Sequence, residues 1–157
     1  MSQLNVDTIG GQTGTTISIA SGHTLSGLGS GITVADQFNL TTDITSPTNG
    51  SQTDITTNLS RSTGTLGGGN LGTAMSLSSG IFTFPSTGYY LVTLTGRMKS
   101  NTSPTNMFVT STDDNFSSEQ NIIVLQVYDA DSGDTSITAS GNALLDITNT
   151  SNDKVKL

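Results

Sequence analysis

The sequence offers few side chains for acid–base or nucleophilic chemistry. Its single histidine, His23, would have to be the base of any serine-centred triad, but it lies in the Gly-rich stretch GHTLSGLGSG of residues 22–31. A catalytic base has to be held in a structured pocket. We therefore expect His23 to be a solvated or packing residue, and the chain to be no enzyme.

Carboxylates are the next candidates, because glycosidases use a pair of them. Asp113 and Asp114 are adjacent, and Asp129, Asp131 and Asp134 surround a Ser-Gly pair in a predicted hairpin. A general acid needs apolar surroundings that raise its pKa, whereas all five acids lie in polar turn sequences. The pattern is more typical of solvated turn residues than of a catalytic pair.

The acids Asp129, Asp131 and Asp134 also alternate as they do in a calcium loop. The segment departs from the EF-hand pattern, because Gly133 comes one position early and Ser140 replaces the bidentate glutamate. A metal-free β-turn and an open cation site are both compatible with this spacing. The sequence therefore assigns no catalytic, cofactor-binding or metal residue, and no cofactor is expected.

The composition indicates β-structure. Gly, Ser, Thr and Asn fill 80 of the 157 positions, while hydrophobic residues make up 32% and charged residues 11%. Disordered chains typically combine low hydrophobicity with many Glu, Lys and Pro, whereas this chain has one Glu and three Pro. A Thr-rich chain of this length predicts one all-β domain with a thin core, which burial between subunits would supplement.

Charge and hydropathy narrow the possible partners. The net charge is −7, and the five basic residues form no cluster, so nucleic acid is not an expected partner. No apolar run approaches the roughly 20 residues of a membrane helix, and residues 1–5 lack the features of a signal peptide. There is no cysteine, which excludes disulfides and Cys-ligated zinc. We expect a product made in a cytoplasm, without membrane insertion.

The chain divides into an arm, residues 1–34, and a head, residues 35–157. In the arm, residues 4–9 and 16–20 alternate apolar and polar side chains and predict two short strands, followed by the Gly-rich stretch. Two isolated strands bury little surface and leave unpaired edges that can add to another sheet. We expect a docking or trimerisation arm, with a plain flexible linker as the alternative, and a head that folds without it.

The head contains a series of predicted strands separated by turn residues. Asn49-Gly50 predicts a tight turn, and Gly67-Gly68-Gly69 lacks the Lys and Ser/Thr of a phosphate-binding loop, so residues 66–70 are predicted to be a plain loop. No helical period exceeds two turns. The predicted strands are residues 38–44, 55–59, 75–77, 81–84, 89–98, 107–111, 122–128, 135–139, 143–148 and 154–157.

One motif lies in the densest apolar part of the head, residues 79–92, which read SGIFTFPSTGYYLV. Phe82 shares one face of a strand with the aromatic residue two positions later, Pro85 closes the strand, Gly88 permits a corner, and Tyr90 begins the next buried strand. With Gly80, these residues match Gly-x-Phe-x-x-Pro-x-x-Gly-x-Tyr at every anchor. The segment resembles the complement globular-head and tumour-necrosis-factor-like jelly rolls, which implies a jelly-roll β-sandwich and a homotrimer.

The stretches LNVDTI at residues 4–9, ISIASGH at 17–23 and GTAMSLSSG at 72–80 look like the arm-plus-jelly-roll proteins of marine bacteriophages. This resemblance implies a virion structural protein, such as a tail fibre or capsid surface appendage, attached to other virion proteins by its arm. The chain departs from the family at residues 55–61, where an aromatic is usual, and after residues 155–157, where a final strand is usual. Either that strand is absent and the sheet edge is open to another subunit, or the strand assignment is shifted.

Two other function classes compete with this interpretation. A lectin-like module that binds host polysaccharide needs aromatic side chains beside polar groups, and the chain has three Tyr and no Trp. A polysaccharide depolymerase needs a credible acid pair. The expected function is therefore a surface appendage of a virion that contributes to host attachment.

Overall fold

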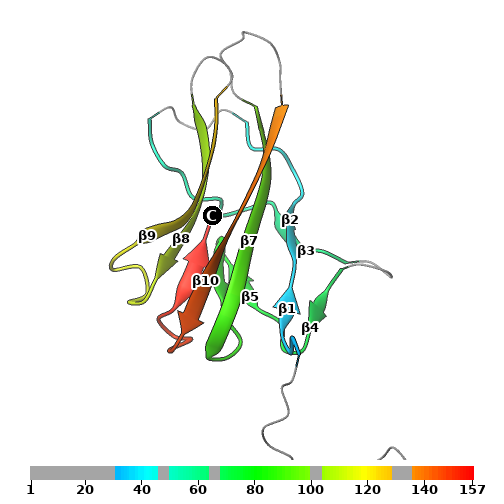
Figure 1. Ribbon diagram of the computed structural model, residues 1–157, viewed down its shortest axis with the longest axis vertical. Coiled ribbons are helices and arrows are strands. Elements are labelled where there is room, and N and C mark those ends of the chain that lie inside the picture. Colours follow the sequence, from blue (N-terminus) through cyan, green and yellow to red (C-terminus); the bar gives the residue numbers. More distant parts are fainter. Residues whose placement is uncertain (1–30, 46–49, 64–67, 100–103, 129–135) are drawn as a thin grey trace, which may run out of the picture. The chain divides into compact units, whose positions relative to one another are not determined.

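The computed structural model describes residues 31–45, 50–63, 68–99, 104–128 and 136–157 (Figure 1). Within these ranges the protein is all-β and has no helix, and so none that could span a membrane. The strands are β1 Ala35–Asp36, β2 Phe38–Leu40, β3 Leu59–Arg61, β4 Asn70–Leu71, β5 Ser76–Ser78, β6 Ile81–Thr83, β7 Gly88–Lys99, β8 Thr105–Thr112, β9 Gln120–Val127, β10 Ser136–Ile147 and β11 Lys154–Lys156.

The strands form one large sheet and three pairs, all antiparallel. The large sheet has the order β5-β6-β11-β8-β9, so the last strand of the chain lies at its centre. The strands β7 and β10 pair along twelve residues each and form a long ribbon. The remaining pairs are β2-β3 and β1-β4. Strands that are distant in the sequence therefore build every layer.

The ribbon packs on the large sheet, in a two-layer arrangement compatible with a β-sandwich. A Cβ atom added to Gly141 of β10 would lie 2.9 Å from Ile123 Cγ2 and 3.0 Å from Leu125 Cδ2 of β9. One added to Gly96 of β7 would lie 2.7 Å from the sulfur of Met107 in β8. These two glycines let the backbones of the layers approach closely. The buried hydrophobic core consists of Phe82, Phe84, Leu94, Met98, Val109, Ile123, Leu125, Val127, Ile147 and Val155.

Most of the predicted strands are confirmed, including residues 81–84, 89–98, 107–111, 122–128 and 154–157, with ends shifted by a few residues. We predicted two separate strands at residues 135–139 and 143–148. This was wrong, because one strand, β10, runs through both. Gly141 continues the strand opposite Leu94 of β7. A glycine that would end an isolated strand is tolerated here because the facing layer needs the space.

Four other predictions need correction. Residues 55–59 enter a strand only at Leu59, because Ile55 is instead held by a hydrogen bond from its N–H to the carbonyl of Leu157. The strand predicted at residues 38–44 ends at Leu40. Asn70, placed in a loop, pairs with Asp36 as part of β4. The hairpin at residues 129–134 is wrong, because β9 pairs with β8 and β10 pairs with β7.

The arm lies outside the described residues from 1 to 30, and its strands and docking role stay predictions. Residues 33–157 form one compact unit. Its first described strand, β1, begins at Ala35.

Candidate functional site

The glycine–aromatic motif forms the turn between β5 and β6 and the corner between β6 and β7. Gly80 has a φ of +80°, and a Cβ atom there would collide with the carbonyl oxygen of Ile55. Gly88 has a φ of +138°, which disfavours residues with a side chain. The Tyr90 hydroxyl donates to the carbonyl of Ser86 at 3.0 Å and so closes the corner at residues 85–88. Both motif glycines are therefore required by backbone geometry.

The motif aromatics organise the core on one face of β6. Phe82 is 8% exposed and Phe84 3% exposed. Phe82 packs edge-on against Phe38 of β2 with ring centroids 4.9 Å apart, and Phe84 packs against Tyr90 of β7 at 4.7 Å. The β2-β3 pair is thus anchored on β6, and the β7-β10 ribbon on the residue that directly follows it.

An ion pair between a buried carboxylate and a partly exposed arginine joins the first strands of the head to the core. The carboxylate of Asp36, whose side chain is 1% exposed, accepts hydrogen bonds from Arg61 Nε at 2.8 Å and Nη2 at 2.9 Å, and from the backbone N–H of Met75 at 2.9 Å. Burial raises the pKa of Asp36, but the hydrogen bonds from Arg61 and Met75 outweigh burial and hold it below its ordinary value. The Arg61 guanidinium also lies 4.8 Å from the centre of the Phe38 ring.

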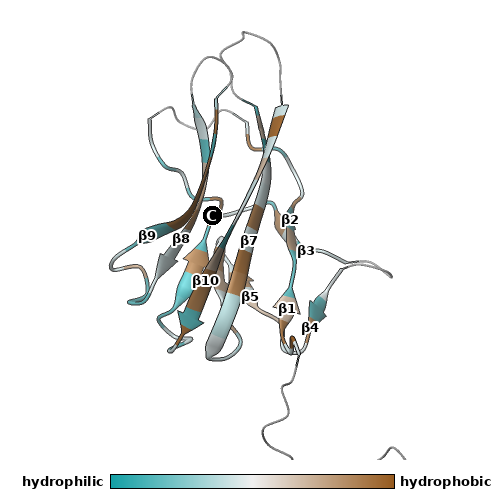
Figure 2. Ribbon diagram, in the orientation of Figure 1, coloured by the Kyte–Doolittle hydropathy of each residue, from teal (hydrophilic) through white to brown (hydrophobic). Residues whose placement is uncertain are grey.

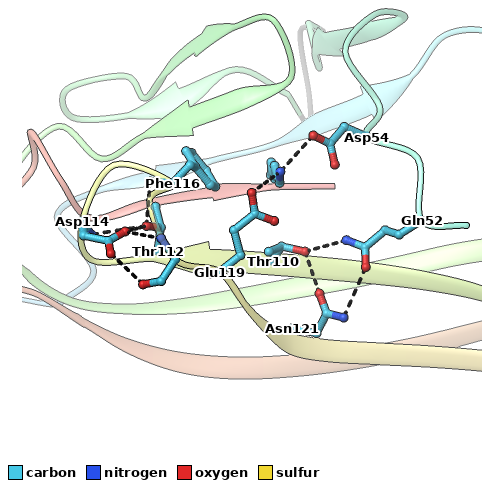
Figure 3. A network of polar contacts seen from close by, with 10 residues as sticks. Gln52, Asp54, Thr110, Thr112, Asp114, Phe116, Glu119 and Asn121 are labelled. Carbon is cyan, nitrogen blue, oxygen red and sulfur yellow. Dashed lines mark hydrogen bonds and ion pairs between the residues drawn. The ribbon is translucent and has the colours of Figure 1, made fainter.

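A second polar network ties the segment of residues 50–56 to the large sheet (Figure 3). Thr110 is 1% exposed, and its hydroxyl donates to Asn121 Oδ1 at 2.7 Å and accepts from Gln52 Nε2 at 3.1 Å. The amide of Asn121 returns a longer bond of 3.4 Å to Gln52 Oε1. The buried hydroxyl therefore has both a hydrogen-bond donor and an acceptor as partners.

Lys156 of β11 is held next to this network. Its ammonium contacts Glu119 Oε1 at 2.7 Å and Asp54 Oδ2 at 2.9 Å, and lies 4.9 Å from the centre of the Phe116 ring. Burial lowers the pKa of Lys156, but the two carboxylates outweigh burial and raise it. A hollow of about 360 Å³ between Gln52, Asp54, Glu119 and Asn121 is lined by groups that already bond to one another or to Lys156.

The predicted acid pair lies in the loop between β8 and β9. Asp114 accepts hydrogen bonds from the hydroxyl and backbone N–H of Ser118 at 2.6 and 2.9 Å, and from the Thr112 hydroxyl at 2.8 Å. These bonds lower its pKa, whereas a general acid requires a raised one. Asp113 is exposed. The geometry assigns Asp114 to holding the loop.

A larger hollow of about 660 Å³ lies between this loop, the end of β10 and the turn before β11. Its most buried acid, Asp153, is 6% exposed and accepts the backbone N–H groups of Thr148 and Asn149, each at 2.7 Å. Over the described ranges, no three His, Cys, Asp or Glu side chains gather closely enough to hold a metal ion. This carboxylate is occupied in closing the β10-β11 turn.

The remaining candidate surface is the side of the ribbon that faces away from the large sheet, which we call the outer ribbon face. It carries exposed apolar side chains at one end, with Tyr89 75%, Leu91 69% and Leu144 68% exposed. Leu91 and Leu144 are directly opposite each other in the register. Figure 2 shows hydrophobic segments on both β7 and β10. Clustered exposed apolar side chains of this kind mark interaction surfaces.

The middle of the outer ribbon face is polar but uncharged. The hydroxyls of Thr95 and Ser140 lie 2.9 Å apart across the two strands. Arg97 lies further along β7 and contacts the Ser136 hydroxyl at 3.2 Å. The face therefore changes from an apolar end through hydroxyl groups to a basic end.

Of the residues singled out in the sequence, His23, Asp129, Asp131 and Asp134 lie outside the described residues. The cation site at residues 129–134 thus stays an open alternative. Asp36, Arg61 and Lys156 were missed, because their partners are distant in sequence and no spacing indicates them. The apolar and aromatic content of residues 89–98 did predict a strand, but residues 89–92 are all apolar or aromatic, so no alternation shows which of them face outward.

Comparisons of the chain with protein-family models, with curated proteins and with solved structures return no match.

Proposed function

We propose that this chain is a non-enzymatic structural protein of a bacteriophage virion. In this proposal, the arm of residues 1–34 attaches it to other virion proteins, and residues 35–157 form a jelly-roll head displayed on the virion surface. The observation that carries the proposal is the motif of five anchors from Gly80 to Tyr90, which resembles the complement globular-head and tumour-necrosis-factor-like jelly rolls. In the described head, these anchors form a turn, a core strand and a corner.

The proposed head is a homotrimer, and the outer ribbon face supports this part of the proposal. A chain with a net charge of −7 repels its own copies, so contact between copies favours surfaces with few carboxylates. The outer ribbon face carries Asp146 at one end and no other acid between Leu91 and Arg97 or between Thr138 and Leu144. Burying its exposed leucines between subunits would also supplement the small core.

The same face argues for self-association over a lectin-like site. Tyr89 is the single aromatic side chain of the outer ribbon face. Asp146 lies opposite it, but the next pair along the ribbon, Leu91 and Leu144, has no hydrogen-bonding groups for sugar hydroxyls. We propose that adhesion to host polysaccharide arises from many weakly binding copies. Assembly on the virion follows synthesis in the host cytoplasm.

Two measurements test the proposal. Light scattering of the full chain after gel filtration should give about three times the chain mass of 16.1 kDa. Antibodies raised against the head should label the surface of purified particles of the phage that encodes it. A stable folded monomer at micromolar concentration contradicts the trimer, and unlabelled particles contradict the virion location.

A further inference from the structure

The large sheet turns one face away from the ribbon, and β9 borders that face. Leu125 and Val127 of β9 are buried in the core, so the residues that alternate with them point to the other side. These are Val124, Gln126 and Tyr128, the last of which directly follows β9. All three are exposed, and Tyr128 is 59% exposed.

The neighbouring strand β8 completes this surface. In the register, Phe108 is directly opposite Val124, and Asn106 is directly opposite Gln126. Phe108 is partly buried but does not belong to the core cluster, because Val109 next to it points inward. We call Asn106, Phe108, Val124, Gln126 and Tyr128 the outer sheet face.

The two amides of the outer sheet face have no protein partner within the described ranges. Asn106 and Gln126 are exposed, and neither side chain hydrogen-bonds to another residue there. Further along the same sheet, the amides of Gln52 and Asn121 bond to each other and to Thr110. A free amide both donates and accepts hydrogen bonds, as a hydroxyl group does. The opposed amides of Asn106 and Gln126 therefore suit a ligand rich in hydroxyl groups.

The outer sheet face carries no charge in an acidic chain. No Asp, Glu, Lys or Arg occurs between Thr105 and Thr112 or between Gln120 and Tyr128, although the net charge is −7. A charged ligand would find no counter-charge on this face, whereas a neutral ligand needs none. The exposed apolar surface is also small for a protein partner, because a stable protein interface buries about 800 Å² on each side.

We propose that the outer sheet face binds a neutral pyranose unit of a glycan. The ring of Tyr128 would stack on the C–H face of the sugar, because the face of an aromatic ring carries partial negative charge that attracts C–H groups. Residues two apart on a strand lie about 6.5 Å apart. The Gln126 amide, and the Asn106 amide opposite it, would therefore reach the hydroxyl groups of the same sugar.

The inference deepens the proposed adhesion to host polysaccharide by naming a binding site on each copy. Its role in host attachment rests on the proposed function, whereas the site itself rests on the geometry of β8 and β9. The two exposed faces of the head then differ in their partners. The leucines of the outer ribbon face contact other copies, and the free amides of the outer sheet face contact sugar.

Titration of the purified full chain with short neutral oligosaccharides tests the inference. The probes are trisaccharides of glucose, galactose, mannose and N-acetylglucosamine, and NMR measures the affinity of each chain without avidity. Tyr128→Ala removes the ring, and Tyr128→Phe keeps it. Asn106→Leu removes one amide, and the matched control Asn39→Leu makes the same change at an exposed position of β2.

We expect at least one probe to bind with a dissociation constant near about 1 mM. Tyr128→Ala should weaken this binding about tenfold and Asn106→Leu about fivefold, while Tyr128→Phe and Asn39→Leu should stay within about twofold of the unmodified chain. Circular dichroism should show that all four variants are folded.

Three results overturn the inference. They are an unmodified chain that binds none of the probes, equal losses for Asn39→Leu and Asn106→Leu, and dissociation of the oligomer by Tyr128→Ala, which would make this face a contact between copies. Particles labelled by antibodies against the head, together with a chain that binds no probe, overturn the inference alone. Unlabelled particles, together with a chain that binds as expected, overturn the virion location alone and support the site.

Discussion

Arg61 binds both carboxylate oxygens of Asp36, with Nε 2.8 Å from Oδ1 and Nη2 2.9 Å from Oδ2. Asp36 belongs to β1 and Arg61 to β3, and the backbone N–H of Met75 shares the same carboxylate. One buried acid therefore connects three segments that are not joined by a common sheet. This contact decides how the first strands of the head are held against the core.

Replacing Arg61 with Met should strongly destabilise the head. The substitution keeps much of the side-chain volume but leaves the 1%-exposed carboxylate of Asp36 without its cation, and a carboxylate that is shielded from water and unpaired is destabilising. Urea denaturation followed by circular dichroism measures the change. Lys154→Met is the control, because its ammonium binds the exposed Asn115 and its loss should cost under about 1 kcal/mol. Equal effects of the two variants would contradict the assigned role.

The same carboxylate should make stability depend on acid pH. Its pKa is lower in the folded head than its ordinary value of 3.8, so the unfolded chain binds the proton more readily. The contribution of Asp36 is therefore fully present above about pH 4 and is lost as the pH falls through the folded-state pKa. Urea midpoints from pH 7 down to pH 2.5 should fall less steeply for Asp36→Asn than for the unmodified chain. Parallel curves would show that Asp36 does not titrate differently on folding.

Truncating Phe82 to Ala should cost on the order of 3–5 kcal/mol, because the ring is buried and contacts Phe38 across the layers. The melting temperature should fall accordingly. Val124→Ala provides the comparison, since Val124 is 55% exposed on β9. An unchanged melting temperature for Phe82→Ala would mean that the glycine–aromatic motif does not build the core.

A charge on the outer ribbon face should prevent self-association. Leu144→Asp places a carboxylate beside the exposed Leu91, and burying it between subunits would be costly. We expect light scattering to report a folded monomer. Val124→Asp, at a position that is 55% exposed on the large sheet, should leave the oligomer intact. An oligomer that survives Leu144→Asp would place the contact elsewhere.

Removing the arm should separate attachment from folding. A chain that begins at Ala35 keeps every described strand and should stay soluble and β-rich by circular dichroism. It should fail to incorporate into particles that lack the native protein. If the shortened chain binds particles as well as the full chain, the head itself is the anchor.

The all-β class was predictable from local features. Alternation at period two, the Asn-Gly and Pro-Ser-Thr-Gly turns and the scarcity of helix formers act over a few residues, and they are visible in the sequence. The motif from Gly80 to Tyr90 is of the same kind, because backbone sterics at a glycine and the facing of residues two apart depend only on neighbours. For that reason the strands on both sides of this motif were predicted within a few residues.

Strand pairing depended on contacts between segments that are far apart in the sequence. Asp36 meets Arg61 across 25 residues, and Lys156 meets Asp54 across 102, so no spacing rule reveals either pair. In the sequence alone, Gly141 indicates a break between two strands. In the structure it lies against β9, where the lack of a side chain lets β10 continue without interruption. The sequence alone determined which segments are strands and where they turn. Only the tertiary structure decided which strands pair, because packing between layers selects the register and turns the outer ribbon face away from the large sheet.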